Sequence, residues 1–210
     1  MKGYFNTPLK SSQVLITPPS VEPVTLDFFK LWARIDSDIT QDDPILCFLL
    51  TAARQYCEAT LNWALITQTW QFNLDSFPWY WDTNSIVGPS IDLPMPPLQS
   101  VTSLCYYDPS NTLQTLDPSD YVVDTNSTPG RIIRQYNIAW PITRWRSDSV
   151  EITLVCGFGD SVSDVPSNII QAICVMALYS YRNRGDETVQ LQIPPGVDAL
   201  LGATSIGVYR

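Results

Sequence analysis

The chain has 210 residues, 45% of them hydrophobic, and a formal net charge of -9 from 12 basic and 21 acidic residues. This length can bury a main core without disulfides or metals, no window approaches the roughly 20 apolar residues of a membrane span, and the N-terminus lacks the apolar stretch of a signal peptide. The acidic balance disfavours a surface that grips nucleic acid, because that affinity comes from Lys and Arg neutralising phosphates. We expect a soluble intracellular protein of one domain with an elaboration.

The sequence offers little equipment for catalysis. It contains no histidine, which removes the usual general base, the commonest metal ligand and every triad that depends on imidazole. Its five cysteines are scattered and odd in number, so we expect buried free thiols rather than a zinc site or redox motif. Acidic pairs such as Asp117 and Asp120 lie in turns or at helix starts, where Asp is expected for capping. We therefore predict no enzyme activity, no metal and no cofactor.

Two helices are predicted in the first third of the chain. They follow an N-terminal arm, residues 1–20, which is rich in Ser, Thr and Pro. Thr25 is the predicted N-cap of a short helix that ends near Asp36. A second helix is predicted from Asp43, its N-cap, with Pro44 at the first helical position, where the missing N–H costs nothing. Its wide apolar face runs to Leu61 and indicates a central position in a helical bundle.

The hydrophobic period changes to two after Leu65, which predicts strands. The first strand is closed by Pro78, and the last strand carries four apolar side chains on one side, namely Val150, Ile152, Leu154 and Cys156. Turn signals separate several short apolar runs between them. Five or six short strands in about a hundred residues predict a mostly antiparallel small sheet or barrel.

Three prolines precede the strand that we predict from Ser100 to Tyr107. Pro94, Pro96 and Pro97 remove N–H donors and restrict the backbone. We expect them to hold the chain extended at a sheet edge and to determine where this strand begins.

Helical spacing returns near the C-terminus. A third long helix is predicted from Pro166 to Arg184, ended by Gly185, and a short helix around Val197 to Leu201. The fold class is therefore α+β: a bundle of three to four helices with a mostly antiparallel β-sheet or barrel-like insertion between the second and third long helices. The predicted divisions are an N-terminal arm (1–20), the first part of the bundle (21–64), the β insertion (65–160), the second part of the bundle (161–201) and a C-terminal tail (202–210).

Several aromatic residues lie in or near predicted loops, namely Trp79, Tyr80, Trp81, Trp140 and Trp145. Exposed aromatic residues are typical anchors of binding surfaces for protein or sugar. An equally good interpretation is that they cover the edge of a small β core. A carbohydrate-binding or adhesin-like β module, which would use exposed Trp79 and Trp81, is therefore one functional hypothesis.

A second hypothesis comes from a resemblance that covers about residues 15–201 in order. The segments that carry it are ITPPSVEPVTLDFFKLWARID, ILCFLLTAARQYCEATLNWALITQTWQFNLDSFP, IDLPMPPLQSVTSLCYYD, LDPSDYVV, PGRI, VEITLVCGFGD, VPSNIIQAICVMALYSYRNR and IPPGVDALL. Together they resemble the head-tail connector proteins, also called adaptor or head-completion proteins, of tailed bacteriophages.

The resemblance implies a structural virion protein. Such proteins form a ring, usually dodecameric, beneath the portal of the DNA-filled capsid and join it to the tail. The implied partners are further copies of the chain, the portal protein, and a tail or neck protein of the stopper or tail-terminator kind. DNA passes through the lumen without specific binding, and no membrane or cofactor is involved. The implied location is the virion neck, after assembly in the host cytoplasm.

A ring needs lateral and axial contacts. We expect the rigid helices Asp43 to Leu61 and Pro166 to Arg184 to form the lateral contacts, and the terminal segments to order on axial partners. The candidate partner interface comprises Trp79, Tyr80, Trp81, Ile206, Val208, Tyr209 and Arg210. A lumen that lets DNA slide should be acidic, and its candidate residues are Asp36, Asp38, Asp42 and Asp43.

Overall fold

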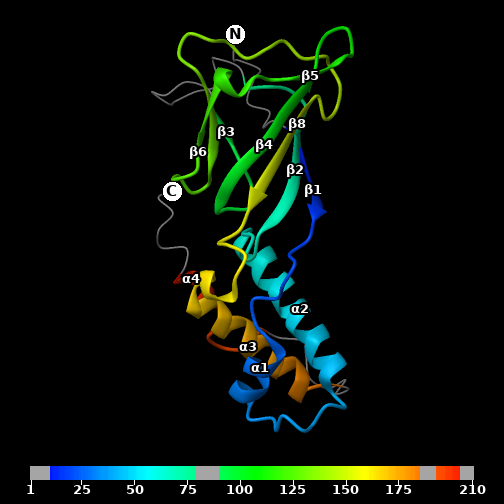
Figure 1. Ribbon diagram of the computed structural model, residues 1–210, viewed down its shortest axis with the longest axis vertical. Coiled ribbons are helices and arrows are strands. Elements are labelled where there is room, and N and C mark those ends of the chain that lie inside the picture. The colour runs from blue at the N-terminus through cyan, green and yellow to red at the C-terminus, as the bar shows by residue number, and fades with distance from the viewer. Residues whose placement is uncertain (1–9, 79–89, 185–192, 204–210) are drawn as a thin grey trace, which may run out of the picture. The chain divides into compact units, whose positions relative to one another are not determined.

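A computed structural model of the chain describes residues 10–78, 90–184 and 193–203 (Figure 1). The chain divides into two compact units, each built from two separate segments. Unit 1 comprises residues 1–18 and 68–156, and unit 2 comprises residues 19–67 and 157–210. The described strands belong to unit 1 and the described α-helices to unit 2. The fold is α+β, and all strands but the first are inserted between helices, as the hydrophobic periods predict.

The described strands of unit 1 form two antiparallel sheets. The five-stranded sheet has the order β1 (Ser11–Thr17), β2 (Gln68–Leu74), β8 (Val150–Cys156), β4 (Leu98–Tyr107) and β5 (Leu113–Thr115). The three-stranded sheet has the order β3 (Ser90–Asp92), β7 (Arg131–Arg134) and β6 (Tyr121–Asp124), and a short 3-10 helix, Pro118–Asp120, leads into β6. The described strands therefore form two open sheets and not a closed barrel.

Strand β8 shows why the alternating pattern predicts a strand. Its four apolar side chains, Val150, Ile152, Leu154 and Cys156, are all fully buried. The strand lies between β2 and β4, and Ile152 is paired with Phe72 on one side and Leu104 on the other. All three side chains are buried, so this row of cross-strand neighbours anchors the core of the sheet.

The proline segment follows β3, the edge strand of the three-stranded sheet, and leads into β4 of the other sheet. The predicted position at a sheet edge therefore agrees with the fold, and β4 begins at Leu98 rather than at the predicted Ser100. The N–H of Leu93 still donates to the carbonyl of Gly130, which extends the pairing of β3 with β7. The other sheet begins at Leu98, which pairs with Cys156. Proline cannot donate to a ladder, so the chain leaves one sheet and joins the other across these residues. Strand β4 itself lies between β8 and β5.

Strand β1 was not predicted, because Ser11–Thr17 falls in the segment that we expect to be an arm. Its side chains are exposed along its whole length, so its sequence carries no one-sided burial pattern. Its partner is distant in the chain, with Ser11 opposite Leu74. Neither feature can be read from local periodicity.

Unit 2 contains the helices α1 (Leu26–Ala33), α2 (Asp43–Leu61), α3 (Ser167–Arg182) and α4 (Val197–Gly202), with a 3-10 turn at Val162–Asp164. Thr25 caps α1 as predicted, since its hydroxyl accepts from the N–H of Phe28. Helix α1 ends earlier than predicted because Arg34 is left-handed, with φ 57. The N-cap of α2 is Asp42, one residue before the predicted Asp43. No described helix combines the length and the apolar character that crossing a membrane requires.

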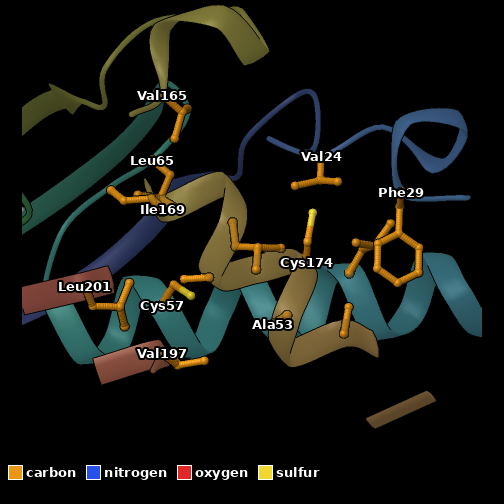
Figure 2. Packing of buried hydrophobic residues seen from close by; sticks show 14 of the residues in the cluster. Val24, Phe29, Ala53, Cys57, Leu65, Val165, Ile169, Cys174, Val197 and Leu201 are labelled. Atoms are coloured by element: carbon orange, nitrogen blue, oxygen red, sulfur yellow. The ribbon is translucent and has the colours of Figure 1, made fainter. Parts of the chain in front are cut away.

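All four described α-helices of unit 2 contribute to its core (Figure 2). Buried residues of α2 recur at helical spacing, at Leu46, Leu50, Ala53 and Cys57. In α3 the fully buried residues are Ile169, Ala172, Ile173, Cys174 and Ala177. Each fully buried Leu or Ile side chain contributes about 1.5–3 kcal/mol relative to exposure. The predicted bundle is therefore held together by facing apolar stripes.

Candidate interaction surfaces

The described residues show little reactive chemistry. They contain no group of three or more His, Cys, Asp or Glu side chains placed to hold a metal ion. Burial raises the pKa of Cys57 and Cys156 to about 12 and that of Cys174 to about 11, so these thiols stay protonated near neutral pH. Cys47 is exposed and Cys105 is half-buried. The expected burial therefore holds for Cys57, Cys156 and Cys174, only partly for Cys105, and not for Cys47. The candidate functional features are therefore surfaces.

Helix α1 presents apolar side chains on two sides. Phe29 is fully buried in the core, whereas Phe28, Leu31 and Trp32 are 46%, 78% and 37% exposed. Their spacing of three and four residues places these three side chains on one face of the helix, which we call the α1 stripe. Apolar patches that remain exposed on a folded protein mark interaction sites.

Helix α2 carries a second exposed apolar pair. Ile45 and Phe48 are 42% and 69% exposed, and they lie one turn apart on the helix that the sequence predicts as a lateral contact. The opposite face of α2 packs in the core through Leu46 and Leu50. Helix α2 is therefore fixed in unit 2 by one face and exposes an apolar pair on another.

A buried ionic network fixes α2 to its surroundings. The Arg54 Nε donates to Glu22 Oε2 at 2.8 Å, and its Nη1 donates to Glu58 Oε2 at 2.5 Å. The other oxygen of Glu58 accepts from the backbone N–H of Leu65 at 3.1 Å, and Glu22 also accepts from Thr51. Arg54 and Glu58 are each only 7% exposed. The network connects α2 to the segment before α1 and to the segment that leaves α2.

Next to this network, unit 2 has an apolar groove of about 560 Å³. Its apolar lining comes from the segment before α1, from α1 and from α2, namely Val21, Val24, Leu26, Cys47 and Leu50. Glu22, Thr25, Thr51, Asp160 and Ser161 supply its polar atoms. Asp160 is exposed and forms no ion pair with a described residue. The groove thus combines an apolar lining with an unpaired carboxylate.

The connection between β7 and β8 contains two tryptophans with different surroundings. The sequence leaves open whether each covers the β core or anchors a binding surface. Trp140 stacks on the buried ring of Phe77, with ring centroids 4.7 Å apart, and lies under the Arg134 guanidinium. Trp145 is 98% exposed. Trp140 therefore covers the edge of the β core, whereas Trp145 is free to serve as a binding anchor.

Strand β1 forms one edge of the five-stranded sheet and, among the described strands, pairs only with β2. Three successive apolar residues of β1, Val14, Leu15 and Ile16, are 48%, 41% and 52% exposed. The strand has no Lys or Pro of the kind that protects natural edge strands from pairing. Its outer edge is a further candidate surface.

The four acidic residues predicted to line a lumen differ in their surroundings. Asp36 and Asp38 are exposed, and neither forms an ion pair with a described residue. Asp42 accepts from the Tyr181 hydroxyl at 2.5 Å and from Arg184 at 3.0 Å, which lowers its pKa below the ordinary 3.8. Asp43 lies 2.5 Å from the Lys30 ammonium. The charges of Asp42 and Asp43 are therefore balanced within unit 2.

The predicted partner interface lies outside the described residues. This holds for Trp79, Tyr80 and Trp81 and for the C-terminal group of Ile206, Val208, Tyr209 and Arg210. The carbohydrate hypothesis depends on Trp79 and Trp81, and no observation on the described residues supports it. Both assignments stay predictions.

Solved structures with the same arrangement include chains of gene transfer agent particles. A chain of the neck of an empty gene transfer agent (GTA) particle, computed with C6 symmetry, superimposes with a TM-score of 0.73 and 23% identity over 91% of this chain and 94% of that chain. A chain of the virion of a native GTA particle superimposes with a TM-score of 0.70 and 22% identity, over 91% of this chain and 93% of that chain. A chain of the neck of a native GTA particle, computed with C12 symmetry, superimposes with a TM-score of 0.63 and 24% identity, over 90% of this chain and 93% of that chain. The chain has the fold of a GTA neck protein. No protein-family model matches the sequence, and a search of curated proteins finds no match.

The GTA neck fold supports the resemblance to phage head-tail connectors that the sequence indicates. The likeness spans both units, since nine tenths or more of each chain is covered. It therefore includes the β insertion as well as the helices. At identities of 22–24%, the superpositions show a shared fold and nothing further.

Sequence reasoning missed the α1 stripe and the buried ionic network. A signal for the stripe exists, because Phe28, Leu31 and Trp32 lie opposite the residues that face the core, so that α1 is apolar on both sides. The network leaves no comparable signal. Glu22 and Arg54 are 32 residues apart, and nothing in the local pattern separates Arg54 from an ordinary surface arginine.

Proposed function

We propose that this chain is a structural protein of a phage-like virion neck, a head-tail connector that assembles into a closed ring between the portal and the tail. The observation that carries the proposal is the fold shared with neck chains over nine tenths of each chain. Those necks were computed with C6 and C12 symmetry, which fits a ring of identical copies. The chain has a structural role, connecting the capsid to the tail, and no catalytic role. It is located in the virion neck and is assembled there in the host cytoplasm.

The exposed apolar residues of unit 2 suit lateral contacts between copies. A closed ring is built from head-to-tail contacts that join two different surfaces. Phe48, 69% exposed on α2, supplies one such surface on an element that packing holds rigid. The portal and a tail or neck protein are the proposed axial partners, bound by the terminal segments.

Particle mass tests this proposal directly. Purified protein, alone and mixed with the portal protein of the same phage, is weighed by mass photometry, and its particles are imaged by electron microscopy. We expect closed rings whose mass is a multiple of 23.6 kDa. Phe48→Asp should prevent ring formation, whereas the matched control Gln55→Asp, on the exposed surface of α2, should not. Wild-type protein that stays monomeric under both conditions contradicts the proposal.

The acidic lumen is part of the same proposal and rests on Asp36 and Asp38, whose charges no described cation balances. Negative charge along the channel keeps DNA from adhering during passage. Wild-type rings should therefore show no binding to duplex DNA at physiological salt in fluorescence anisotropy. Asp36→Lys combined with Asp38→Lys should create salt-sensitive binding. Tight binding by the wild type would refute this part.

A further inference from the structure

The most exposed large hydrophobic side chain among the described residues belongs to Trp145 in the connection between β7 and β8. It is 98% exposed, although a tryptophan normally buries 150–250 Å² or so on folding. Arg144 and Arg146 flank it and are also exposed. We call residues 144–146 the Trp145 tip. Neither the core of unit 1 nor the proposed helix contacts account for it.

The backbone of the Trp145 tip is held firmly on both sides. The N–H of Arg144 donates to the carbonyl of Tyr107 at 2.9 Å. The buried hydroxyl of Ser149 lies 2.7 Å from the Arg144 carbonyl and 2.9 Å from the Arg146 carbonyl. The guanidinium of Arg146 lies 4.0 Å from the ring centroid of Tyr107. An anchor presented on such a fixed backbone loses little conformational entropy when it binds.

The charges of the tip are also uncompensated. Arg131 and Arg134 in the same unit pair with Asp124 and Asp120, whereas Arg144 forms no ion pair with a described residue, and neither does Arg146. Trp and Arg dominate the energetic centres of protein interfaces. The tip therefore fits a protein surface with an apolar hollow for the indole and a carboxylate at its rim. Two arginines on a chain of net charge -9 are too few to hold the phosphates of DNA.

The groove of unit 2 offers this chemistry on another copy of the same chain. Its lining is mainly apolar, and its volume of about 560 Å³ leaves room for an indole. Asp160 lines the groove and has no cationic partner among the described residues. Tip and groove are two different surfaces, as a head-to-tail ring contact requires.

We propose that the Trp145 tip of one copy inserts into the groove of the next copy, with Trp145 against Val21 and Leu50 and with Arg146 facing Asp160. This contact would be one of the lateral interfaces between neighbouring copies, and it rests on the proposed function as a ring-forming connector. It adds an aromatic anchor in unit 1 to the apolar pair on α2.

The first test measures ring stability, under whichever condition yields wild-type rings, alone or on the portal. Trp145→Ala should raise the protein concentration needed for ring formation by about 30-fold or more, the factor that corresponds to an interface hot spot. Tyr136→Ala is the matched control, because Tyr136 is 87% exposed in the same connection. It should leave ring formation unchanged. Near-ultraviolet circular dichroism of the monomer confirms that both variants fold.

The second test exchanges the two charges. Arg146→Asp and Asp160→Arg should each weaken the ring, and the double variant should recover most of the loss. Rings of Trp145→Ala as stable as the wild type, or a double variant weaker than both single ones, would overturn the inference. So would duplex DNA binding that Trp145→Ala abolishes. Absence of rings in the wild type would instead refute the proposed function itself.

Discussion

Replacing Arg54 should destabilise unit 2 more than replacing one partner of an exposed ion pair would. Its side chain is almost fully buried and lies between two carboxylates, of which Glu58 is also buried. In Arg54→Met the hydrophobic volume is largely kept, but the buried carboxyl group of Glu58 loses its cationic partner. Breaking one partner of a buried pair costs about 3–5 kcal/mol. We expect a loss of that size in the free energy of unfolding.

Glu58→Gln should cost less. Glutamine keeps a carbonyl oxygen that can accept from the N–H of Leu65, and Arg54 retains Glu22 at 2.8 Å. The expected loss is about 1.5–3 kcal/mol, the value for a hydrogen bond to a charged group. The double variant Arg54→Met with Glu58→Gln removes both charges together. It should therefore be more stable than Arg54→Met alone, with a coupling energy of about 0.5–3 kcal/mol.

Urea unfolding followed by far-ultraviolet circular dichroism measures these changes, because the helical signal comes from unit 2. A urea slope of about 1–3 kcal/mol/M converts each midpoint shift into a free energy. Arg184→Met is the control, since the Arg184–Asp42 pair is exposed to solvent and its removal should change stability much less. If Arg54→Met costs under about 1 kcal/mol, like a surface pair, or if the double variant is no more stable than Arg54→Met, the electrostatic argument is wrong.

Three further predictions concern single sites. Gly157→Ala should lower the melting temperature and cost more than about 1 kcal/mol, because φ is +128 and an added Cβ would lie 2.6 Å from the Ile66 carbonyl; an unchanged melting curve refutes this. Cys47 should react with a thiol reagent in the native protein, and the three buried thiols only on unfolding, as counted by mass spectrometry. The hydrogen bond from Tyr181 lowers the pKa of Asp42 below 3.8, so this carboxylate stabilises the fold above that pH and less as acid protonates it. In Asp42→Asn the free energy of unfolding should therefore fall less as the pH is lowered into the acid range. A pH dependence identical to that of the wild type would contradict this prediction.

Local periodicity predicted those elements that bury one face. The alternation in β8 and the helical spacing in α2 and α3 reflect burial directly, because a residue on the wrong face would be exposed. The small helix α4 follows from the same rule, with Val197 and Leu201 buried one turn apart. These elements also establish the α+β class and the insertion of strands between helices.

Elements that depend on distant partners could not be predicted in this way. Strand β1 buries neither face and exists through its pairing with β2, which lies more than fifty residues away. The prolines before β4 limit hydrogen bonding, but only the pairing of β3 with β7 shows that they connect two sheets. The distinction between a barrel and two open sheets likewise depends on which strands pair, and local sequence does not encode that choice.

The candidate surfaces show the same division. A list of acidic residues treats Asp36 and Asp42 alike, yet Asp42 is bound by Tyr181, 139 residues away in the chain. Trp140 and Trp145 are five positions apart in one connection, and only the stacking on Phe77 separates the core residue from the exposed one. Composition thus identifies which residues can bind a partner, and long-range contacts decide which of them are free to do so.

Net charge and exposed apolar surface act together in the proposed assembly. Copies that each carry -9 repel one another over distances near the Debye length, about 8 Å at physiological salt. The apolar residues that could drive indiscriminate association, such as Leu31 and Phe48, act only at contact distance. In the proposed assembly we expect two copies to associate where close apolar contact and a local charge reversal coincide, as in the proposed contact of Arg146 with Asp160. We expect a small cationic tip on an acidic chain to favour one head-to-tail orientation over random aggregation, which is the selectivity that closing a ring demands.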